Sequence, residues 1–286
     1  MLLSHLTPQP RFKHDLRKLV DCLLDRAKKW WIVSSVSRIV SIIAGAMSVL
    51  LFPGFKPAAV IIFLVYIVSD VAAWRSDQFK GFAQSVLRKL DFRNSFGWPI
   101  SGEEMSDLIV DCPTRLRRRI PPPSDDGYFA SNEAVGTARA LDNLQEASWW
   151  SKHLARRMGH ITLGITIGLI LASFIVHLIS INSVRDFDTL TSIGRVVTSA
   201  LMLVLSLGLI RLTVGYYNFA KKAEQAERDA IRLLKSNPDE LDAVKAWQEY
   251  HVSRAAAPLI PSVLWRRMNK DLNEAWSVYR TRSGES

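Results

Sequence analysis

Residues 58–74 read AAVIIFLVYIVSDVAAW, and this stretch decides the fold. Its apolar residues follow one another without the alternation of polar and apolar positions that is typical of a half-buried strand. The stretch is close to the ~20 helical residues that cross ~30 Å of hydrocarbon. Inside lipid only helices and closed barrels satisfy all their backbone hydrogen bonds. The stretch therefore predicts a membrane-spanning helix.

Three further stretches have the same character, at residues 33–51, 161–181 and 196–216. The first link, FPGFKP at residues 52–57, contains a Pro-Gly turn signal, and the second, at residues 182–194, is longer and polar. The sequence thus predicts an all-α membrane protein whose four transmembrane helices form two hairpins (2+2), with cytoplasmic helical segments. The alternative is a large soluble core, but four such helices in 286 residues leave too little amphipathic chain to cover them.

Basic residues indicate how the hairpins are oriented. Of the 37 Lys and Arg residues, only Lys56, Arg185 and Arg195 lie in or directly beside the links that close the hairpins. Because Lys and Arg are retained on the cytoplasmic side, both termini and the long middle segment are expected there. The net charge of +10 then reports membrane topology more than nucleic-acid binding, since no nucleic-acid motif accompanies it. Residues 1–8 have no charged segment before an apolar core, so no secretory signal is expected.

Five segments are expected along the chain. They are a cytoplasmic amphipathic helix (1–32), hairpin 1 (33–74), a cytoplasmic middle segment (75–157), hairpin 2 (158–217) and cytoplasmic C-terminal helices (218–286). Within the middle segment we expect a helix over residues 75–90, an irregular Pro-rich stretch over 91–127, and a helix from about residue 138 into the third span.

Two helices are predicted near the C-terminus. Residues 237–240, NPDE, combine an N-cap residue, a proline at the first helical position and an acid at the third, which predicts a helix capped by Asn237 and reaching about Ala255. Pro258 and Pro261 then break the chain. A last helix follows, with an apolar stripe typical of a packing face, formed by Trp265, Met268, Leu272, Trp276 and Tyr279.

Charged residues inside the predicted spans are candidates for a gate. Arg38, Asp70 and Arg211 lie at similar depth, ~6 to 8 Å inside the cytoplasmic boundary at 1.5 Å per residue. A pair between Arg38 and Asp70 is geometrically natural, with Arg211 as a competing or additional partner. Two interpretations remain open. Either the arginines reach the headgroups and Asp70 is hydrated at a helix end, or the three residues form a polar layer that keeps a conduit closed.

Two cytoplasmic groups of basic and aromatic residues are candidates for binding an anionic nucleotide. Guanidinium groups bind phosphates and aromatic rings stack on bases. The alternative for the basic residues is contact with lipids of the inner leaflet. The first group is Arg117, Arg118, Arg119, Tyr128 and Phe129, and the second is Lys152, His153 and Arg156.

Signatures of catalysis are missing from the sequence. It contains no phosphate-binding loop, no GxSxG or HExxH motif and no Cys/His cluster. We therefore expect no catalytic residue, no cofactor, no metal and no enzymatic activity. Cys22 and Cys112 both fall on the expected cytoplasmic side, where thiols stay reduced, so no disulfide is expected.

Residues 122–131 (PPSDDGYFAS), 143–146 (NLQE) and 149–158 (WWSKHLARRM) resemble the central block of the SMODS-associated four-transmembrane family. The likeness covers most of residues 13–220 and includes the 2+2 layout. It implies a pore-forming effector of a bacterial anti-phage system, located in the inner membrane.

The resemblance also implies how such an effector works. A neighbouring cyclic-nucleotide synthase would supply a cyclic oligonucleotide, and the activated effector would oligomerise and permeabilise the membrane, causing abortive infection. Membrane lipid and further copies of the chain are the other expected partners, with no nucleic-acid polymer. Two alternatives remain open, a non-enzymatic membrane-anchored scaffold or sensor, and a small transporter.

Overall fold

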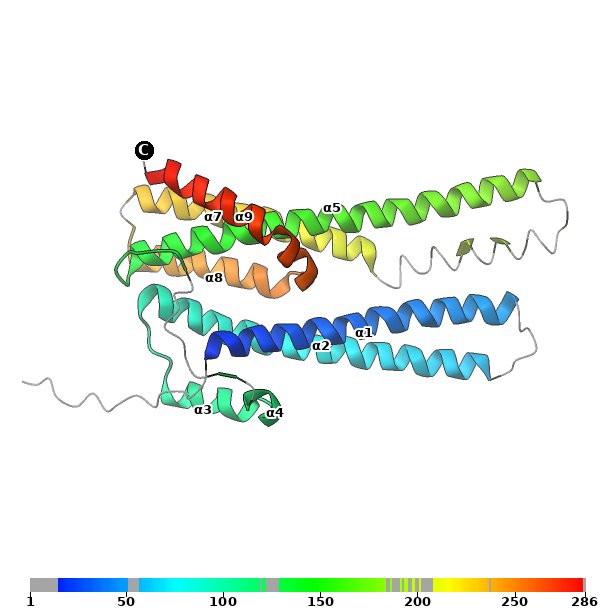
Figure 1. The fold of residues 1–286 in the computed structure, drawn as a ribbon, viewed down its shortest axis with the longest axis horizontal. Helices are drawn as coiled ribbons and strands as arrows, with labels where there is room; N and C mark the ends of the chain where they lie inside the picture. Colours follow the sequence, from blue (N-terminus) through cyan, green and yellow to red (C-terminus); the bar gives the residue numbers. More distant parts are fainter. Residues whose placement is uncertain are drawn as a thin grey trace, which may run out of the picture. The chain divides into compact units, whose positions relative to one another are not determined.

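The computed structural model describes residues 15–50, 57–118, 120–121, 129–183, 186, 191, 193–194, 197–198, 201, 208–236 and 238–284. These residues form helices and no strand (Figure 1). The predicted all-α class is therefore confirmed for the described part of the chain. The long helices are α1 (Leu16–Leu50), α2 (Ala58–Phe96), α5 (Thr137–Ser183) and α7 (Leu209–Lys235), and the shorter ones are α3 (Gly102–Asp111), α4 (Thr114–Arg117), α8 (Glu240–Ala256) and α9 (Ser262–Gly284).

The chain divides into two compact units, each assembled from separate stretches of sequence. Unit 1 comprises Met1–Ala27, Gln78–Ser151 and Lys222–Ala256, and unit 2 comprises Lys28–Asp77, Lys152–Lys221 and Ala257–Ser286. Each of the long helices contributes residues to both units.

One hydrophobic core of unit 1 joins the start of α1, the second half of α2 and α3. Its buried residues include Leu19, Leu23, Val86, Leu90 and Leu108. The helix α3 begins with a capping box in which the Ser101 hydroxyl accepts from the Glu104 N–H and the Glu104 carboxylate accepts from the Ser101 N–H. Glu104 also pairs with Lys89 of α2, and this hydrogen bond lowers the pKa of the Glu104 carboxyl.

The prediction of an irregular stretch over residues 91–127 was wrong for three parts of it, which are the end of α2, α3 and the short helix α4. The helix α2 runs on to Phe96, and Gly97 then ends it in the left-handed region with φ 73°. A Cβ at Gly97 would lie 2.7 Å from Val135 Cγ1, so glycine is required there for space as well. The second part is α3, whose capping box of Ser101 and Glu104 is a local signal present in the sequence.

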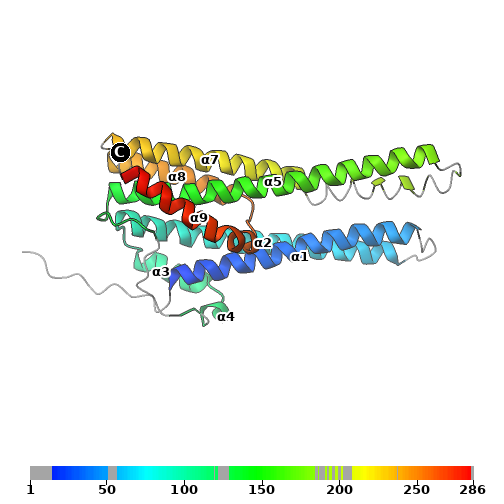
Figure 2. The ribbon, with the colours of Figure 1, turned by 45° about the horizontal axis from the view of Figure 1, so that its top comes forward.

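The helix α8 packs on α5 within unit 1 (Figures 1 and 2). Trp247 Nε1 donates to the Ala140 carbonyl at 2.8 Å, and the Tyr250 hydroxyl donates to the Ala147 carbonyl at 3.0 Å. The predicted start of this helix was wrong, because Asp239 Oδ1 accepts from the Asp242 N–H at 2.8 Å and α8 begins at Glu240. Asn237 itself lies outside the described residues.

In unit 2 the helix α9 packs on α5 and α7. Leu264 is buried with Met158 of α5 and Tyr216 of α7, and Met268 packs against them. The predicted stripe is right at Leu272 and Trp276, which are buried, and wrong at Trp265, which is exposed. Leu264 takes the place of Trp265 on the packing face.

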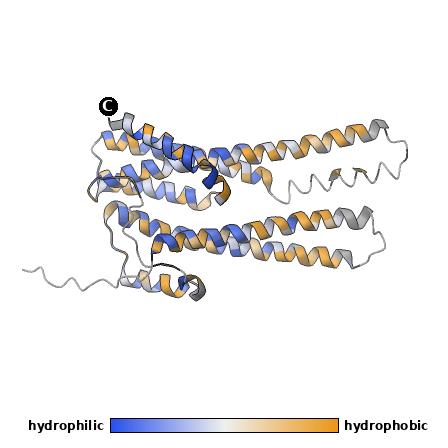
Figure 3. Ribbon diagram, in the orientation of Figure 1, coloured by the Kyte–Doolittle hydropathy of each residue, from blue (hydrophilic) through white to orange (hydrophobic). Residues whose placement is uncertain are grey.

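One segment of the described chain, Thr137–Val176, is long and apolar enough to cross a membrane. Figure 3 shows hydrophobic residues dominating the later half of α5, whereas its first half is mixed. Four spans, the hairpin boundaries and the orientation of the termini stay predictions.

Candidate functional site

Hydroxyl side chains are buried along the predicted spans of unit 2. These residues belong to α1, α2, α5 and α7, and they are Ser34, Ser41, Ser69, Ser76, Thr162, Thr166, Ser173 and Thr213. In α1, α5 and α7 the hydroxyl donates to the carbonyl four residues earlier at Ser41, Thr162, Thr166, Ser173 and Thr213. Such bonds satisfy a polar side chain within its own helix, without water.

Large apolar side chains on the same helices are exposed. Phe63 of α2 is 63 % exposed and Ile179 of α5 is 60 % exposed. Others on α1, α2 and α5 include Val33, Val36, Val40, Val60, Ile61, Leu64, Ile165, Leu171, Phe174 and Ile175. Exposed apolar surface costs about 25 cal/mol per Å² in water, and soluble monomers rarely carry extended apolar patches. This part of unit 2 is suited to an apolar surrounding.

Arg38 and Asp70 are in contact at the interface of α1 and α2. Arg38 Nη2 lies 3.3 Å from Asp70 Oδ1, and Arg38 Nε donates to Ser69 Oγ at 3.0 Å. Ser69 Oγ lies 3.1 Å from the Ser34 carbonyl and 3.2 Å from Ser34 Oγ. The side chains of Arg38 and Asp70 are 25 % and 58 % exposed, so the pair is half-open rather than sealed.

Arg211 is the third charge that the sequence places at this depth. It lies on the first turn of α7 in unit 2, and its side chain is exposed. No bond between Arg211 and Asp70 exists among the described residues. A role for Arg211 in gating stays a prediction.

A close approach of α5 and α7 lies near the cytoplasmic ends of the predicted spans. A Cβ at Gly159 would lie 3.2 Å from the Tyr217 ring, so glycine leaves room for that ring. The Tyr217 hydroxyl is hydrogen-bonded to His160 Nδ1 at 2.9 Å.

The first predicted ligand group lies in unit 1 as far as it is described. Arg117 Nη1 donates to the Ile109 carbonyl at 3.0 Å, which ties α4 to α3. Arg118 is exposed, and Phe129 contacts Trp247 edge-on with ring centroids 6.4 Å apart. Arg119 and Tyr128 lie outside the described residues.

The second predicted ligand group lies in unit 2, on α5. Lys152 and His153 are half-buried and Arg156 is exposed. The two groups thus belong to different units, and a role for either in binding a nucleotide stays a prediction.

A buried ionisable cluster in unit 1 was missed by the sequence analysis. Asp91 of α2 is 1 % exposed, and its Oδ2 lies 3.8 Å from His251 Nε2 and 3.6 Å from Arg254 Nη1. Neither Asp91 oxygen accepts a hydrogen bond in the described structure. Burial raises the pKa of Asp91 to about 7, although Arg254 opposes the shift. Burial, with Arg254 adding to it, lowers the pKa of His251 to about 3.

A signal for this cluster exists in the sequence. Asp91 follows Leu87 by four residues and His251 follows Trp247 by four, so each shares a helix face with a buried apolar residue. The cluster has no access for a substrate, because both Asp91 and His251 are buried. Its burial links the cluster to the stability of unit 1.

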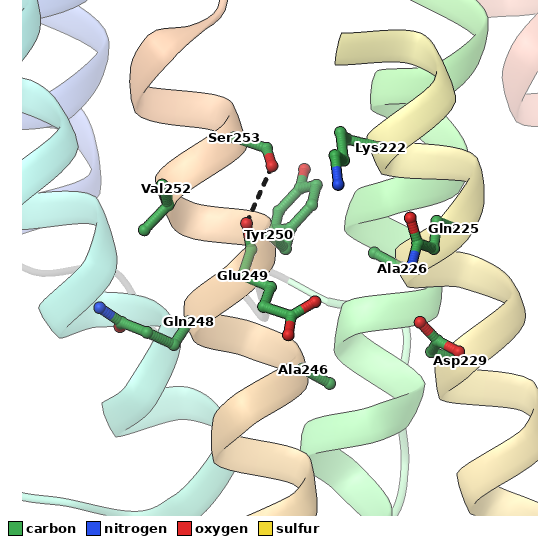
Figure 4. Close-up of a pocket in the computed structure, with 10 residues that line it drawn as sticks. All are labelled: Lys222, Gln225, Ala226, Asp229, Ala246, Gln248, Glu249, Tyr250, Val252 and Ser253. Atoms are coloured by element: carbon green, nitrogen blue, oxygen red, sulfur yellow. Dashed lines mark hydrogen bonds between the residues drawn. The ribbon is translucent and has the colours of Figure 1, made fainter. Parts of the chain in front are cut away.

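An open groove of about 440 Å³ lies between α7 and α8 of unit 1. Figure 4 shows Lys222 and Asp229 on α7 and Glu249 and Ser253 on α8 along its sides. Among the described residues that line it, Lys222 is the one cation beside two carboxylates. The groove lacks the excess of positive charge that a ligand with several phosphates requires.

Comparisons with known proteins give no match: no family model fits the chain, and no curated protein or solved structure is similar to it.

Proposed function

We propose that this chain is a multi-pass effector of the bacterial inner membrane, with both termini in the cytoplasm. A cyclic oligonucleotide activates it, and several copies then assemble and permeabilise the membrane. Permeabilisation would arrest or kill an infected cell, as in abortive infection.

The observation that carries the membrane part of this proposal is the burial pattern of unit 2. Hydroxyl and other small side chains are buried there while large aliphatic side chains are exposed, along the apolar stretches of α1, α2 and α5. A hydrocarbon surrounding favours both features, because lipid solvates the aliphatic side chains and small residues let helices pack closely. The four stretches predicted as spans all fall within unit 2.

Permeabilisation is supported by the polar network of α1 and α2 together with the resemblance of residues 122–158 to four-transmembrane effectors. Arg38, Ser69 and Asp70 form a polar layer near the cytoplasmic end of the predicted spans. Four helices in one chain hardly surround a wide aqueous lumen, so a pore requires several copies.

The test is leakage from vesicles that contain the purified full-length protein. A set of cyclic dinucleotides and trinucleotides is added to vesicles loaded with potassium and with a small dye. We expect at least one nucleotide to release the contents, and we expect the vesicles to stay sealed without it. Retention of both ions and dye with every nucleotide would contradict pore formation.

A membrane-anchored scaffold or sensor is the second candidate. It is favoured by the hydrophobic core of unit 1, which includes Leu19, Leu23 and Val86. A folded unit of this kind can bind a partner without any pore in the membrane. Tight binding of one nucleotide to a protein whose vesicles remain sealed would select this function.

A further inference from the structure

The first turns of α9 carry exposed apolar and basic side chains on both sides of the buried Leu264. Val263 is 73 % exposed and Trp265 is 48 % exposed, whereas the neighbouring Leu264 is buried. Arg266, Arg267 and Lys270 are exposed on the same side of the helix as Val263, whereas Trp265 lies on the other side of Leu264. Residues 262–270 contain no acid, so this surface has three positive charges and two apolar side chains.

Contacts within unit 2 fix where this surface lies relative to the predicted spans. Lys28 Nζ donates to Ser262 Oγ at 2.9 Å, and the Tyr216 hydroxyl donates to the Leu259 carbonyl at 2.6 Å. Lys28 precedes the first span and Tyr216 ends the fourth, so both mark the cytoplasmic boundary predicted from the sequence.

Two more contacts place α9 at the same level. Leu264 is buried with Met158, which lies three residues before the third predicted span. A Cβ at Gly215 would lie 2.9 Å from Pro258 Cγ, so the chain entering α9 runs close against α7. The start of α9 is therefore held at the cytoplasmic ends of three predicted spans.

The side chains on this surface match the chemistry of a lipid headgroup region. Tryptophan is enriched at the membrane interface because its ring is apolar and its N–H is polar. Arginine and lysine interact with the anionic lipids of the cytoplasmic leaflet, and an apolar residue beside them enters the boundary of the acyl chains.

We infer that the exposed side chains of Val263, Trp265, Arg266, Arg267 and Lys270 on α9 form a docking surface for the anionic phospholipid headgroups of the cytoplasmic leaflet. The inference rests on the proposed membrane location of unit 2 and adds to it the class of lipid and the residues that contact its headgroup. The surface would fix α9 at the interface through Val263 and Trp265, and select anionic lipid through Arg266, Arg267 and Lys270.

The experiment uses the full-length protein with Cys22 and Cys112 changed to alanine and one nitroxide label at a time. Labels are placed at Val263, at Val278 on a later turn of α9, and at Ile170 within the third predicted span. Vesicles consist of phosphatidylcholine alone or with about 30 % phosphatidylglycerol. Accessibility to oxygen, which enters lipid, is compared with accessibility to a water-soluble nickel complex.

In anionic vesicles we expect the label at Val263 to be oxygen-accessible and shielded from nickel, as at Ile170, and the label at Val278 to be open to nickel. Shielding at Val263 should fall at least threefold in neutral vesicles, since each basic residue near an anionic surface favours contact. The triple variant R266Q/R267Q/K270Q should lose the same shielding in anionic vesicles. The charge-matched control R228Q/R232Q/K235Q, on α7 of unit 1, should keep it.

A second measurement needs no cysteine changes. Brominated phosphatidylglycerol should quench part of the tryptophan fluorescence of the native sequence, and W265F should lose that part while W276F, at a buried position, should not.

Three outcomes would overturn the inference. Nickel access at Val263 with shielding at Ile170 removes the docking surface and leaves the membrane proposal standing. Nickel access at Ile170 removes both. Spin–spin broadening at Val263 that is independent of anionic lipid assigns the surface to a second copy of the chain.

Discussion

Arg38 Nη2 of α1 lies 3.3 Å from Asp70 Oδ1 of α2, and Arg38 Nε donates to Ser69 Oγ on the residue next to Asp70. One guanidinium group thus bridges a carboxylate and a hydroxyl of the facing helix. The bridge occurs where the proposed membrane region meets the cytoplasm.

Loss of the Asp70 charge is expected to raise leak without a signal. D70N should increase resting leak of potassium from vesicles, because Arg38 loses its ionic partner among the polar contacts that hold α1 against α2. The direct effect on stability should be on the order of 1 kcal/mol, since both side chains are partly exposed. The charge swap R38D/D70R should restore part of the resting seal.

The control for this prediction is D77N, which removes an exposed carboxylate two turns further along α2 in unit 2. It should leave the resting leak unchanged. If D70N and R38Q both match the native protein in resting and activated leak, the pair does not keep a conduit closed, and its side chains only extend toward the headgroups.

Close packing of α5 on α7 predicts that a side chain at Gly159 destabilises unit 2. G159L should lower the free energy of unfolding by about 1–3 kcal/mol, because a Cβ there would already lie 3.2 Å from the Tyr217 ring. G164L is the matched control, since nothing lies within 4 Å of a Cβ at Gly164. Unfolding of the two variants in mixed micelles with increasing denaturing detergent measures the difference. Equal stability of G159L and G164L would contradict the close approach.

The orientation predicted from the basic residues can be checked by labelling. Single cysteines replacing Gly54 and Asp186 in a Cys22- and Cys112-free protein should react with an impermeant maleimide in intact cells. A cysteine replacing Val110, which is 79 % exposed in unit 1, should react only after the cells are opened. Labelling at Val110 in intact cells would reverse the topology.

In a variant without His251, the stability of unit 1 should fall as the pH rises. The pKa of Asp91 is about 7, above its ordinary value of 3.8, so the folded state holds an extra proton between these values. Its contribution to stability is therefore present below pH 4 and is lost as the pH rises to 7. H251Q removes the opposing titration of His251, so the free energy of unfolding should fall by on the order of 1 kcal/mol per pH unit between these values. Hydrogen exchange of α8, corrected for intrinsic rates, measures it.

Removal of Asp91 should give the opposite slope. The pKa of His251 is about 3, below its ordinary value of 6.5, so the folded state resists protonation. D91N should lose stability as the pH falls from 6.5 toward 3, by the same exchange measurement. In the native protein the two slopes oppose one another and the profile should be flatter. Parallel pH profiles for H251Q and D91N would show that the two groups do not titrate as their burial requires.

Periodicity and local capping made much of the fold predictable. The helical run into the third span and the proline-broken chain after Ala256 follow from patterns that involve neighbouring residues. The capping box of Ser101 and Glu104 was equally local, and it was overlooked because the flanking glycine and proline residues favoured a loop.

The sequence could not predict the features that depend on which helix faces pack against each other. Leu264 and Trp265 are adjacent and both apolar, and the contact of α9 with Met158 and Tyr216 decides which one is buried. Burial of Asp91 beside His251 and Arg254 likewise brings together residues that are about 160 positions apart. The depth of Arg38 and Asp70 along their predicted spans follows from residue counts, so their proximity could be predicted. No such count relates Asp91 to His251, so their proximity could not be predicted.

The hydroxyl groups of Ser41, Thr166 and Thr213 donate to carbonyls of their own helices. A helix face of this kind tolerates either a neighbouring helix or a water column, because turning it from one to the other breaks no bond between helices. Resistance to such a turn would then be concentrated where polar bonds do cross between helices, at Ser34, Arg38 and Ser69 for α1 and α2 and at His160 and Tyr217 for α5 and α7. The helices would then turn against one another easily except where polar bonds join them.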